Sequence, residues 1–381
     1  MKDETKLTTL GRNHEQKSGA VNPPVVHAST VLFPTYAELR AAVKNRHDVF
    51  FYGRFGTPTT KAFCDAMAEL EGGAGCAVFP SGVAAITTSV LTFARPGDHI
   101  LVPSCAYEAT LNFCNTMLRR LGVESTFYDP CVGAAIENLV RANTRLILLE
   151  SPGSLTFEVQ DVPAIVEVAR RHDMVTIMDN TWATPLYFKP LAHGVDISVQ
   201  AATKYIVGHA DAMIGTAAAN GQTWPRLRTA ALRLGQCAAP DDAYLALRGL
   251  RTLGVRLRQH QDTALKLARW FAGRAEVQRV LHPALPGDPG HAIWRRDFSG
   301  ASGLFGVVLK KDDDDALAAL LDNLDLFAMG FSWGGYESLI LPVKSDPESG
   351  PLLRVHAGLE DPDDLIADLE KGFERYSAAT G

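Results

Sequence analysis

The sequence lacks the features that mark several classes of protein. Its 381 residues contain no apolar run of roughly 18 or more residues, the length that a membrane-spanning helix needs. The N-terminal stretch "MKDETKLTTLGRNHEQK" is polar and has no apolar core of a signal peptide. The net charge of -6 gives no general attraction to phosphate backbones or anionic lipid. We therefore expect a cytoplasmic protein that binds neither nucleic acid nor membranes.

Cysteine and histidine are present without the spacing of a metal site. The six cysteines include no CxxC pair, and the eleven histidines include no HExxH or similar pattern. We expect no bound metal ion, and we expect the cysteines to be reduced thiols that mostly fill the core.

The alternation of short and long segments predicts the fold class. Apolar residues make up 46% of the chain and charged residues 21%, a balance that can bury sizeable cores. Between residues 74 and 205, short apolar runs alternate with stretches of helical length, such as "HILVP" followed by "ATLNFCNTMLRRLG". This rhythm predicts an α/β fold with a mostly parallel central sheet that helices cover on both faces. In such sheets, functional sites lie at the carboxyl ends of the strands.

The length and the change of pattern along the chain predict three parts. Residues 1–55, which include the Pro-rich "VNPPVVHAST", are expected to form an extended N-terminal arm, and residues 56–240 a large cofactor-binding domain. Residues 241–381 are expected to form a smaller C-terminal α+β domain. Apolar residues at helical spacing over residues 242–273 predict one long helix, or two helices joined near Gly254.

Three features along the predicted sheet indicate a site. Lys204 lies among small and apolar residues in "SVQAATKYIVGHADAMIG", where a confined ammonium group loses its proton more easily. Asp179 ends an apolar strand in "TIMDNTWATP", and Ser81 and Gly82 lie between a strand and a helix in "CAVFPSGVAAITT". Taken singly, these are also the features of a solvated lysine, a turn carboxylate and a helix cap. Together they supply what pyridoxal phosphate needs: an amine for the aldehyde, a carboxylate for the ring nitrogen and a helix start for the phosphate.

The lysine segment resembles that of the Cys/Met-metabolism family of pyridoxal phosphate-dependent enzymes, the trans-sulfuration enzymes. The resemblance covers nearly the whole chain and includes "YGRFGTPTT", "FPSGVAAI", "VPSCAYEAT", "ESPGS", "MDNTWATP", "GFSWGGYESL" and "LLRVHAGLED". Within the family, "SWGGYESL" and "ESPGS" resemble segments of the bacterial cystathionine β-lyases more than those of the γ-lyases and γ-synthases. The resemblance implies the type I pyridoxal phosphate-dependent transferase fold, bound pyridoxal 5'-phosphate, and a homotetramer built as a dimer of dimers.

Motif by motif, the resemblance implies a role for each residue. Lys204 is the Schiff-base lysine and the general base, and Asp179 pairs with the pyridinium nitrogen. Tyr107 stacks on the ring and is a second candidate for handling a proton. The residues expected to line the phosphate are Ser81, Gly82, Val83 and Thr203, with Tyr52 and Arg54 reaching the phosphate of the neighbouring subunit. The residues expected around the substrate are Phe55, Asn112, Ser332, Trp333 and Arg354, the arginine binding the α-carboxylate.

Three positions depart from the pattern of the lyases that the chain resembles. Phe55 stands where a second arginine is frequent, Asn112 where an aspartate is frequent, and Leu232 where a tyrosine is frequent. Both charges are thus absent together. A pocket with these side chains and Phe331 is expected to suit an apolar S-substituent better than the charged far end of cystathionine.

We therefore expect a carbon-sulfur β-lyase whose substrate is a small amino-acid thioether. It would release L-homocysteine from L-cystathionine by β-elimination, leaving a fragment that water converts into pyruvate and ammonia, or it would act in the same way on related cysteine S-conjugates. Two alternatives stay open: a γ-lyase or γ-synthase of the same family, and a catalytically silent relative that acts as a regulator.

Overall fold

The computed structural model describes residues 1–12, 19–343 and 350–380. A seven-stranded sheet forms its centre, with strand order β1-β7-β6-β5-β4-β2-β3. All strands run parallel except β7, which is antiparallel to both of its neighbours. The predicted mostly parallel sheet is confirmed. Its strands are β1 (Gly75–Phe79), β2 (His99–Pro103), β3 (Glu124–Tyr128), β4 (Thr144–Glu150), β5 (Val175–Asp179), β6 (Ile197–Gln200) and β7 (Gly215–Ala219).

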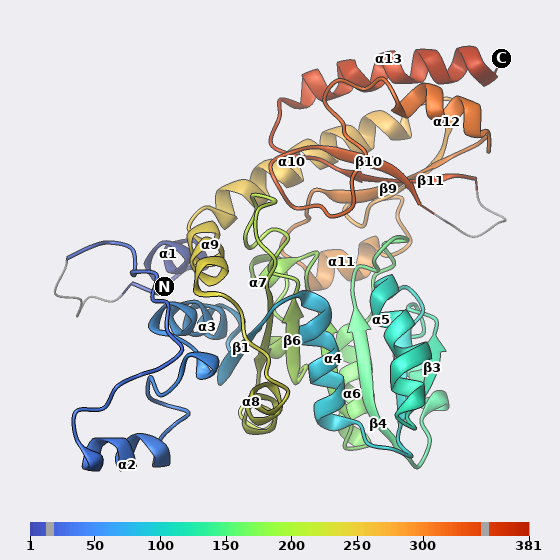
Figure 1. Cartoon of the computed structure of the whole chain (residues 1–381). Coiled ribbons are helices and arrows are strands. Elements are labelled where there is room, and N and C mark those ends of the chain that lie inside the picture. Colours follow the sequence, from blue (N-terminus) through green and yellow to red (C-terminus); the bar gives the residue numbers. More distant parts are fainter. Residues whose placement is uncertain (13–18, 344–349, 381) are drawn as a thin grey trace.

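Helices cover both faces of this sheet, because its central strands are apolar on both sides. Three helices pack on one face (Figure 1): α4 (Gly82–Phe93), α5 (Glu108–Phe113) and α8 (Trp224–Arg233). The other face is covered by α6 (Val162–Arg171) and the short helix η3 (Gly133–Leu139). A further cluster packs α3 (Pro58–Glu71) and α9 (Pro240–Leu250) against β1 and β7.

A second, four-stranded antiparallel sheet follows in the C-terminal part, with strand order β10-β11-β9-β8. Its strands are β8 (Val277–Leu281), β9 (Leu304–Leu309), β10 (Leu339–Val343) and β11 (Leu352–His356). It shares one apolar core with three helices, namely α10 (Leu253–Ala272), α12 (Asp314–Leu321) and α13 (Pro362–Thr380). Four shorter helical segments lie between these elements: η2 (Cys114–Leu118), α7 (Thr184–Tyr187), η4 (Pro190–His193) and α11 (His291–Asp297). The predicted smaller α+β unit is thereby confirmed.

Residues 242–273 form two helices, which is one of the two outcomes that the sequence left open. The break falls at Arg251 and Thr252, and Gly254 lies in the first turn of α10. The buried side chains at the start of α10 belong to the cluster that α3 and α9 form beside the large sheet, whereas those near its end pack against the small sheet. This helix therefore connects the two cores.

The N-terminal segment is less extended than the sequence predicts. It contains α1 (Asp3–Thr9), α2 (Tyr36–Lys44) and the short helix η1 (Gly53–Phe55). The Pro-rich stretch between α1 and α2 has no helix or strand over Val21–Thr30. The sequence analysis did not predict the helices α1 and α2 within this segment.

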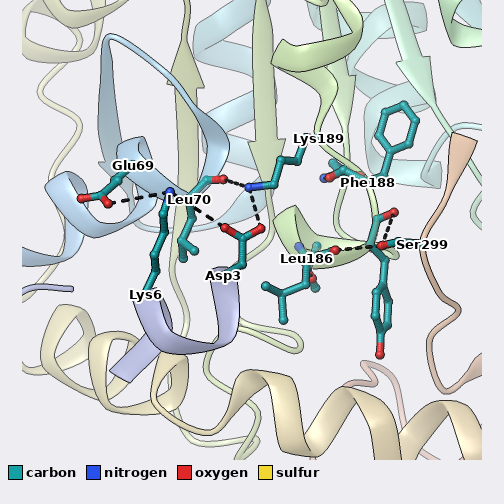
Figure 2. A network of polar contacts seen from close by, with 11 residues as sticks. Asp3, Lys6, Glu69, Leu70, Leu186, Phe188, Lys189 and Ser299 are labelled. Atoms are coloured by element: carbon teal, nitrogen blue, oxygen red, sulfur yellow. Dashed lines mark hydrogen bonds and ion pairs between the residues drawn. The ribbon is translucent and has the colours of Figure 1, made fainter. Parts of the chain in front are cut away.

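Helix α1 docks on the body of the protein through one buried side chain, through ion pairs that Figure 2 shows, and through hydrogen bonds from Arg251 to backbone carbonyl oxygens at the end of the helix. Leu7 is buried in the cluster that α3 and α9 share. A carboxylate oxygen of Asp3 lies 2.8 Å from Nζ of Lys189, and Lys6 lies 3.9 Å from Glu69. These contacts fix the first turns of the chain against the segment that follows β5.

Most of the cysteines lie in the interior of the protein. Cys76, Cys105 and Cys114 are buried, Cys64 is partly buried, and all six cysteines are free thiols. The prediction of mostly core thiols is confirmed, with Cys131 and Cys237 as the exposed exceptions.

Within the described ranges, no helix is long and apolar enough to cross a membrane.

Candidate active site

The carboxyl ends of four neighbouring strands meet at one edge of the large sheet. Glu150 pairs with Asp179 across β4 and β5, and Asp179 pairs with Val199 across β5 and β6. The loops that carry Tyr107 and Lys204 follow β2 and β6 at the same edge. The sequence-based expectation that Asp179 and Lys204 face one pocket is supported by their mutual electrostatic interaction.

The Lys204 amine is the centre of this edge. Its Nζ donates a 2.7 Å hydrogen bond to Oγ of Ser332 and lies 5.3 Å from the centre of the Trp333 ring. Burial and, secondly, the positive charge of Arg354 lower the pKa of Lys204 to about 8, while the Asp179 carboxylate acts in the opposite direction. The neutral, nucleophilic form of the amine is therefore populated near neutral pH.

The Asp179 carboxylate has one engaged oxygen and one available oxygen. Its Oδ1 accepts a hydrogen bond from the backbone N–H of Thr181 at 2.9 Å and another from the Thr181 hydroxyl. Burial raises its pKa, and the Thr181 bonds and Lys204 oppose that rise. Among the described residues, no donor contacts Oδ2. A cationic N–H group of a ligand would satisfy this oxygen.

The start of α4 forms the second wall of the site. Ser81 is the N-cap of α4, and its hydroxyl accepts the N–H of Ala84 at 3.1 Å. Among the described residues, the N–H groups of Gly82 and Val83 have no acceptor, so they remain available to an anion. A Cβ at Gly82 would lie 2.6 Å from that of Ala201, which shows how closely the helix start approaches the lysine segment.

Thr203 is held beside this helix start by its backbone and by its side chain. Its N–H donates to the carbonyl of Ile214 at 3.0 Å, and its hydroxyl accepts the N–H of Ile214 at 2.9 Å. Gly215 follows directly, and a Cβ there would meet the carbonyl oxygen of Ser81. The structure thus brings together the four residues predicted to line a phosphate.

Tyr107 lies at the mouth of the site, at the N-cap of α5, with 48% of its surface exposed. Its backbone N–H donates to a carboxylate oxygen of Glu150 at 2.8 Å. Its phenol interacts electrostatically with Arg354, whose pKa is lowered chiefly by burial. An exposed ring held by its backbone in this way can cover a flat ligand.

The four-stranded sheet contributes the remaining side chains. Arg354 lies at the centre of β11 and donates from Nη2 to the carbonyl oxygen of Ser332 at 3.1 Å. Ser332 has a φ of +93°, a conformation that L-residues other than glycine rarely adopt. The neighbouring Phe331 is 89% exposed. The loop before β10 is thus bent toward Lys204.

The described contacts of these arm residues are with one another and with α8. The Arg54 guanidinium lies 5.0 Å from the Phe55 ring and donates a 2.6 Å hydrogen bond to the carbonyl oxygen of Leu232. Tyr52 and Arg54 are exposed, as is Asn112 on α5. In this single chain, these described contacts do not include Lys204.

Two contributors to the site were missed by the sequence reasoning. Glu150 lies beside Asp179, and burial and the charge of Asp179 raise its pKa well above the usual range. Thr181 holds Asp179 in place. The signals were present: Glu150 ends the apolar strand "RLILLE", and Thr181 is two residues after Asp179, the spacing of an Asx turn.

The residues present fit pyridoxal phosphate. The amine of Lys204 matches an aldehyde, the available Oδ2 of Asp179 matches a protonated ring nitrogen, and the N–H groups of Gly82 and Val83 match a phosphate. The α/β fold and this edge together define a pyridoxal phosphate-dependent enzyme of type I fold.

The chain belongs to the family described as Cys/Met metabolism PLP-dependent enzymes, whose sequence model matches residues 4–374. It is 50% identical over 387 residues to the cystathionine β-lyase of Escherichia coli, covering 98% of each chain. It is 49% identical to the cystathionine β-lyase of Salmonella typhimurium, again covering 98% of each. A crystal structure of cystathionine γ-synthase from Xanthomonas oryzae matches with a TM-score of 0.92 at 31% identity, covering 99% of both chains.

Proposed function

We propose that the protein is a carbon-sulfur β-lyase that acts on L-cystathionine or on related cysteine S-conjugates. The observation that carries the proposal is the Lys204 amine, partly buried between Asp179 and Arg354 and hydrogen-bonded to Ser332. The reaction converts L-cystathionine and water into L-homocysteine, pyruvate and ammonia.

Each side chain has a definite task in this proposal. Arg354 binds the α-carboxylate of the substrate with its planar guanidinium. Lys204, as a neutral amine, takes the proton from the substrate Cα. Asp179 keeps the ring nitrogen of the cofactor protonated. When bound, pyridoxal phosphate supplies a conjugated ring that withdraws the electrons left on Cα, so that the thiolate on Cβ can leave.

The remaining residues hold the cofactor or surround the Lys204 amine. We assign the phosphate to Ser81, Gly82, Val83 and Thr203, and the face of the ring to Tyr107. Ser332 orients the Lys204 amine, and Trp333 forms the wall beside it.

β-Elimination is favoured over γ-chemistry by the relatives at about half identity, which are named cystathionine β-lyases. The γ-synthase with the similar structure is a more distant relative. A γ-lyase or γ-synthase remains the second candidate, because the fold and the lysine segment serve both reactions. The two differ in product, since γ-elimination yields 2-oxobutyrate and γ-replacement a new thioether.

A broad S-substituent preference is a further part of the proposal. The Arg54 guanidinium contacts both the Phe55 ring and the backbone carbonyl oxygen of Leu232, so two of the three departing positions border the same arginine. An aromatic and an aliphatic side chain there would favour an apolar S-substituent over a charged one.

We also propose that the arm of residues 1–55 completes the site of a second copy, beside domains of residues 56–240 and 241–381 in a homotetramer. Tyr52 and Arg54 are exposed, and the described side-chain contacts of Arg54 are with Phe55 and Leu232 and not with Lys204. Mixing Arg54→Ala chains with Lys204→Ala chains, with unfolding and refolding together, should restore activity that neither variant has alone. No restoration would place the arm on its own site.

The direct test is to incubate the protein with pyridoxal phosphate and L-cystathionine and to identify the keto acid. Pyruvate supports the β-lyase, and 2-oxobutyrate supports the second candidate. Lys204→Ala is the control, because it keeps the fold but lacks the amine.

A further inference from the structure

Two side chains of β11 hold the loop that carries Ser332 and Trp333. Arg354 and His356 are two residues apart in the strand and thus lie on the same face of the sheet. Arg354 donates to the carbonyl oxygen of Ser332 at 3.1 Å. The N–H of Gly334 donates to Nε2 of His356 at 3.0 Å, and the carbonyl oxygen of Gly335 lies 3.2 Å from the same nitrogen. The strand therefore holds this loop at two points.

The loop held in this way lies directly on the backbone of Lys204. Gly334 has a φ of +86°, and a Cβ there would lie 2.8 Å from the backbone nitrogen of Tyr205 and 2.9 Å from the carbonyl carbon of Lys204. Ser332, two residues earlier, meets Nζ of the same lysine. The place of Gly334 thus sets how the loop meets both the backbone and the amine of Lys204.

His356 is suited to hold Gly334 but cannot touch a substrate. Its side chain is only 1% exposed and packs against the rings of Tyr205 and His260, with centroids 5.9 and 5.2 Å away. Burial keeps its pKa well below the usual range, so the ring is neutral. A neutral ring has a lone pair on one nitrogen. We assign that lone pair to Nε2, because its contact with the N–H of Gly334 is shorter than its contact with the carbonyl oxygen of Gly335.

We propose that His356 is a positioning residue, which fixes Gly334 against the Lys204 backbone and thereby brings Ser332 to the Lys204 amine. The geometry is independent of the reaction; only the activity readout rests on the proposed function. Loss of the acceptor at His356 should loosen the 332–335 loop and lower turnover.

The test measures amide hydrogen exchange of peptides spanning residues 332–338, in the cofactor-free protein and after pyridoxal phosphate is added. His356→Leu removes the acceptor and should speed exchange at Gly334 about tenfold and lower kcat about tenfold, the effect of one hydrogen bond. His356→Gln places a carbonyl oxygen near the position of Nε2, and should restore both within about threefold. His356→Asn reaches only the position of Nδ1 and should resemble His356→Leu.

His282 provides the matched control. It is also fully buried beside the small sheet, and its Nδ1 accepts the N–H of Ala284 at 3.1 Å. His282→Leu should lower Tm but leave the exchange of residues 332–338 and kcat as in the wild type.

The proposal is overturned if His356→Leu leaves loop exchange unchanged, or if His282→Leu changes it equally. If His356→Leu does not fold, equal exchange and kcat for His356→Gln and His356→Asn would overturn it. A wild-type protein that forms no keto acid would refute the proposed function instead, because the exchange comparison needs no substrate.

Discussion

Nζ of Lys204 donates a 2.7 Å hydrogen bond to Oγ of Ser332, although 128 residues separate the two along the chain. The bond joins the loop after β6 of the large sheet to the loop before β10 of the small one. The large sheet therefore carries the lysine, and the loop before the small sheet orients its amine.

Removing the Ser332 hydroxyl should lower kcat/KM about tenfold, because a hydrogen bond to a charged group contributes about 1.5–3 kcal/mol. Ser332→Ala and Ser332→Gly both lack the hydroxyl, but only glycine relieves the φ of +93°. We expect equal losses of activity and a higher Tm for Ser332→Gly, measured by steady-state kinetics and calorimetry. Wild-type activity in Ser332→Gly would show that the strained backbone, and not the hydroxyl, matters.

The charge of Arg354 should contribute, after burial, to the pH at which the cofactor is taken up. Only the neutral amine reacts with an aldehyde, so the rate of uptake by cofactor-free protein should rise with pH through the Lys204 pKa of about 8. Arg354→Met removes a positive charge that lowers this pKa, so the midpoint should move to higher pH. Stopped-flow absorbance measures the rate.

Arg375→Met is the control for this shift, because Arg375 donates to the carbonyl oxygen of Ala319, away from the site. Its midpoint should match that of the wild type. An unmoved midpoint in Arg354→Met would contradict the electrostatic account of Lys204.

Replacing Asp179 should separate activity from stability. Asp179→Asn removes the charge beside the ring nitrogen and should lower kcat at least about a hundredfold. Because burial raises the pKa of Asp179, its ionised form costs stability above that pKa, and this cost falls as the pH is lowered through it. Asp179→Asn should therefore have an unchanged or higher Tm at neutral pH.

Asp196→Asn is the matched control for Asp179→Asn, because a threonine holds the carboxylate in both cases. Asp196 accepts both the N–H and the hydroxyl of Thr176 at 2.9 Å, yet it lies at the opposite end of β5 from Asp179. We expect a lower Tm with kcat within about twofold of the wild type. A large loss of kcat in this control would mean that any broken carboxylate bond disables the protein.

Restoring the two missing charges should shift the substrate preference. Phe55→Arg combined with Asn112→Asp should raise the ratio of kcat/KM for L-cystathionine over S-methyl-L-cysteine about tenfold, within the range measured for charged pairs. Phe55→Leu changes the ring without adding charge and should leave the ratio nearly unchanged. A wild-type protein that already prefers cystathionine strongly would refute the proposed tolerance for apolar S-substituents.

The local sequence pattern was sufficient to predict those site residues that lie at the ends of strands. Asp179 and Lys204 follow apolar strands of a parallel sheet, and neighbouring strands carry such residues to one edge. The start of α4 was also predictable, since Ser81 caps a helix directly after a strand. These parts required only contacts between elements close in sequence.

The rest depends on contacts that no local pattern encodes. The bond from Lys204 to Ser332 and that from Gly334 to His356 require the small sheet to be placed against the large one. The sequence analysis missed helix α1 because the helix has a single buried apolar side chain, Leu7, and is held by ion pairs and by hydrogen bonds from the distant Arg251. Such a helix is stabilised by its docking rather than by its own periodicity.

The most direct measurement is borohydride reduction of the protein loaded with pyridoxal phosphate, followed by proteolysis and mass spectrometry of the peptides. We predict a reduced cofactor adduct on Lys204 in the wild type and none at this position in Lys204→Ala. An adduct on a different lysine, or no adduct in the wild type, would contradict the account of Lys204 as the amine at the centre of the site.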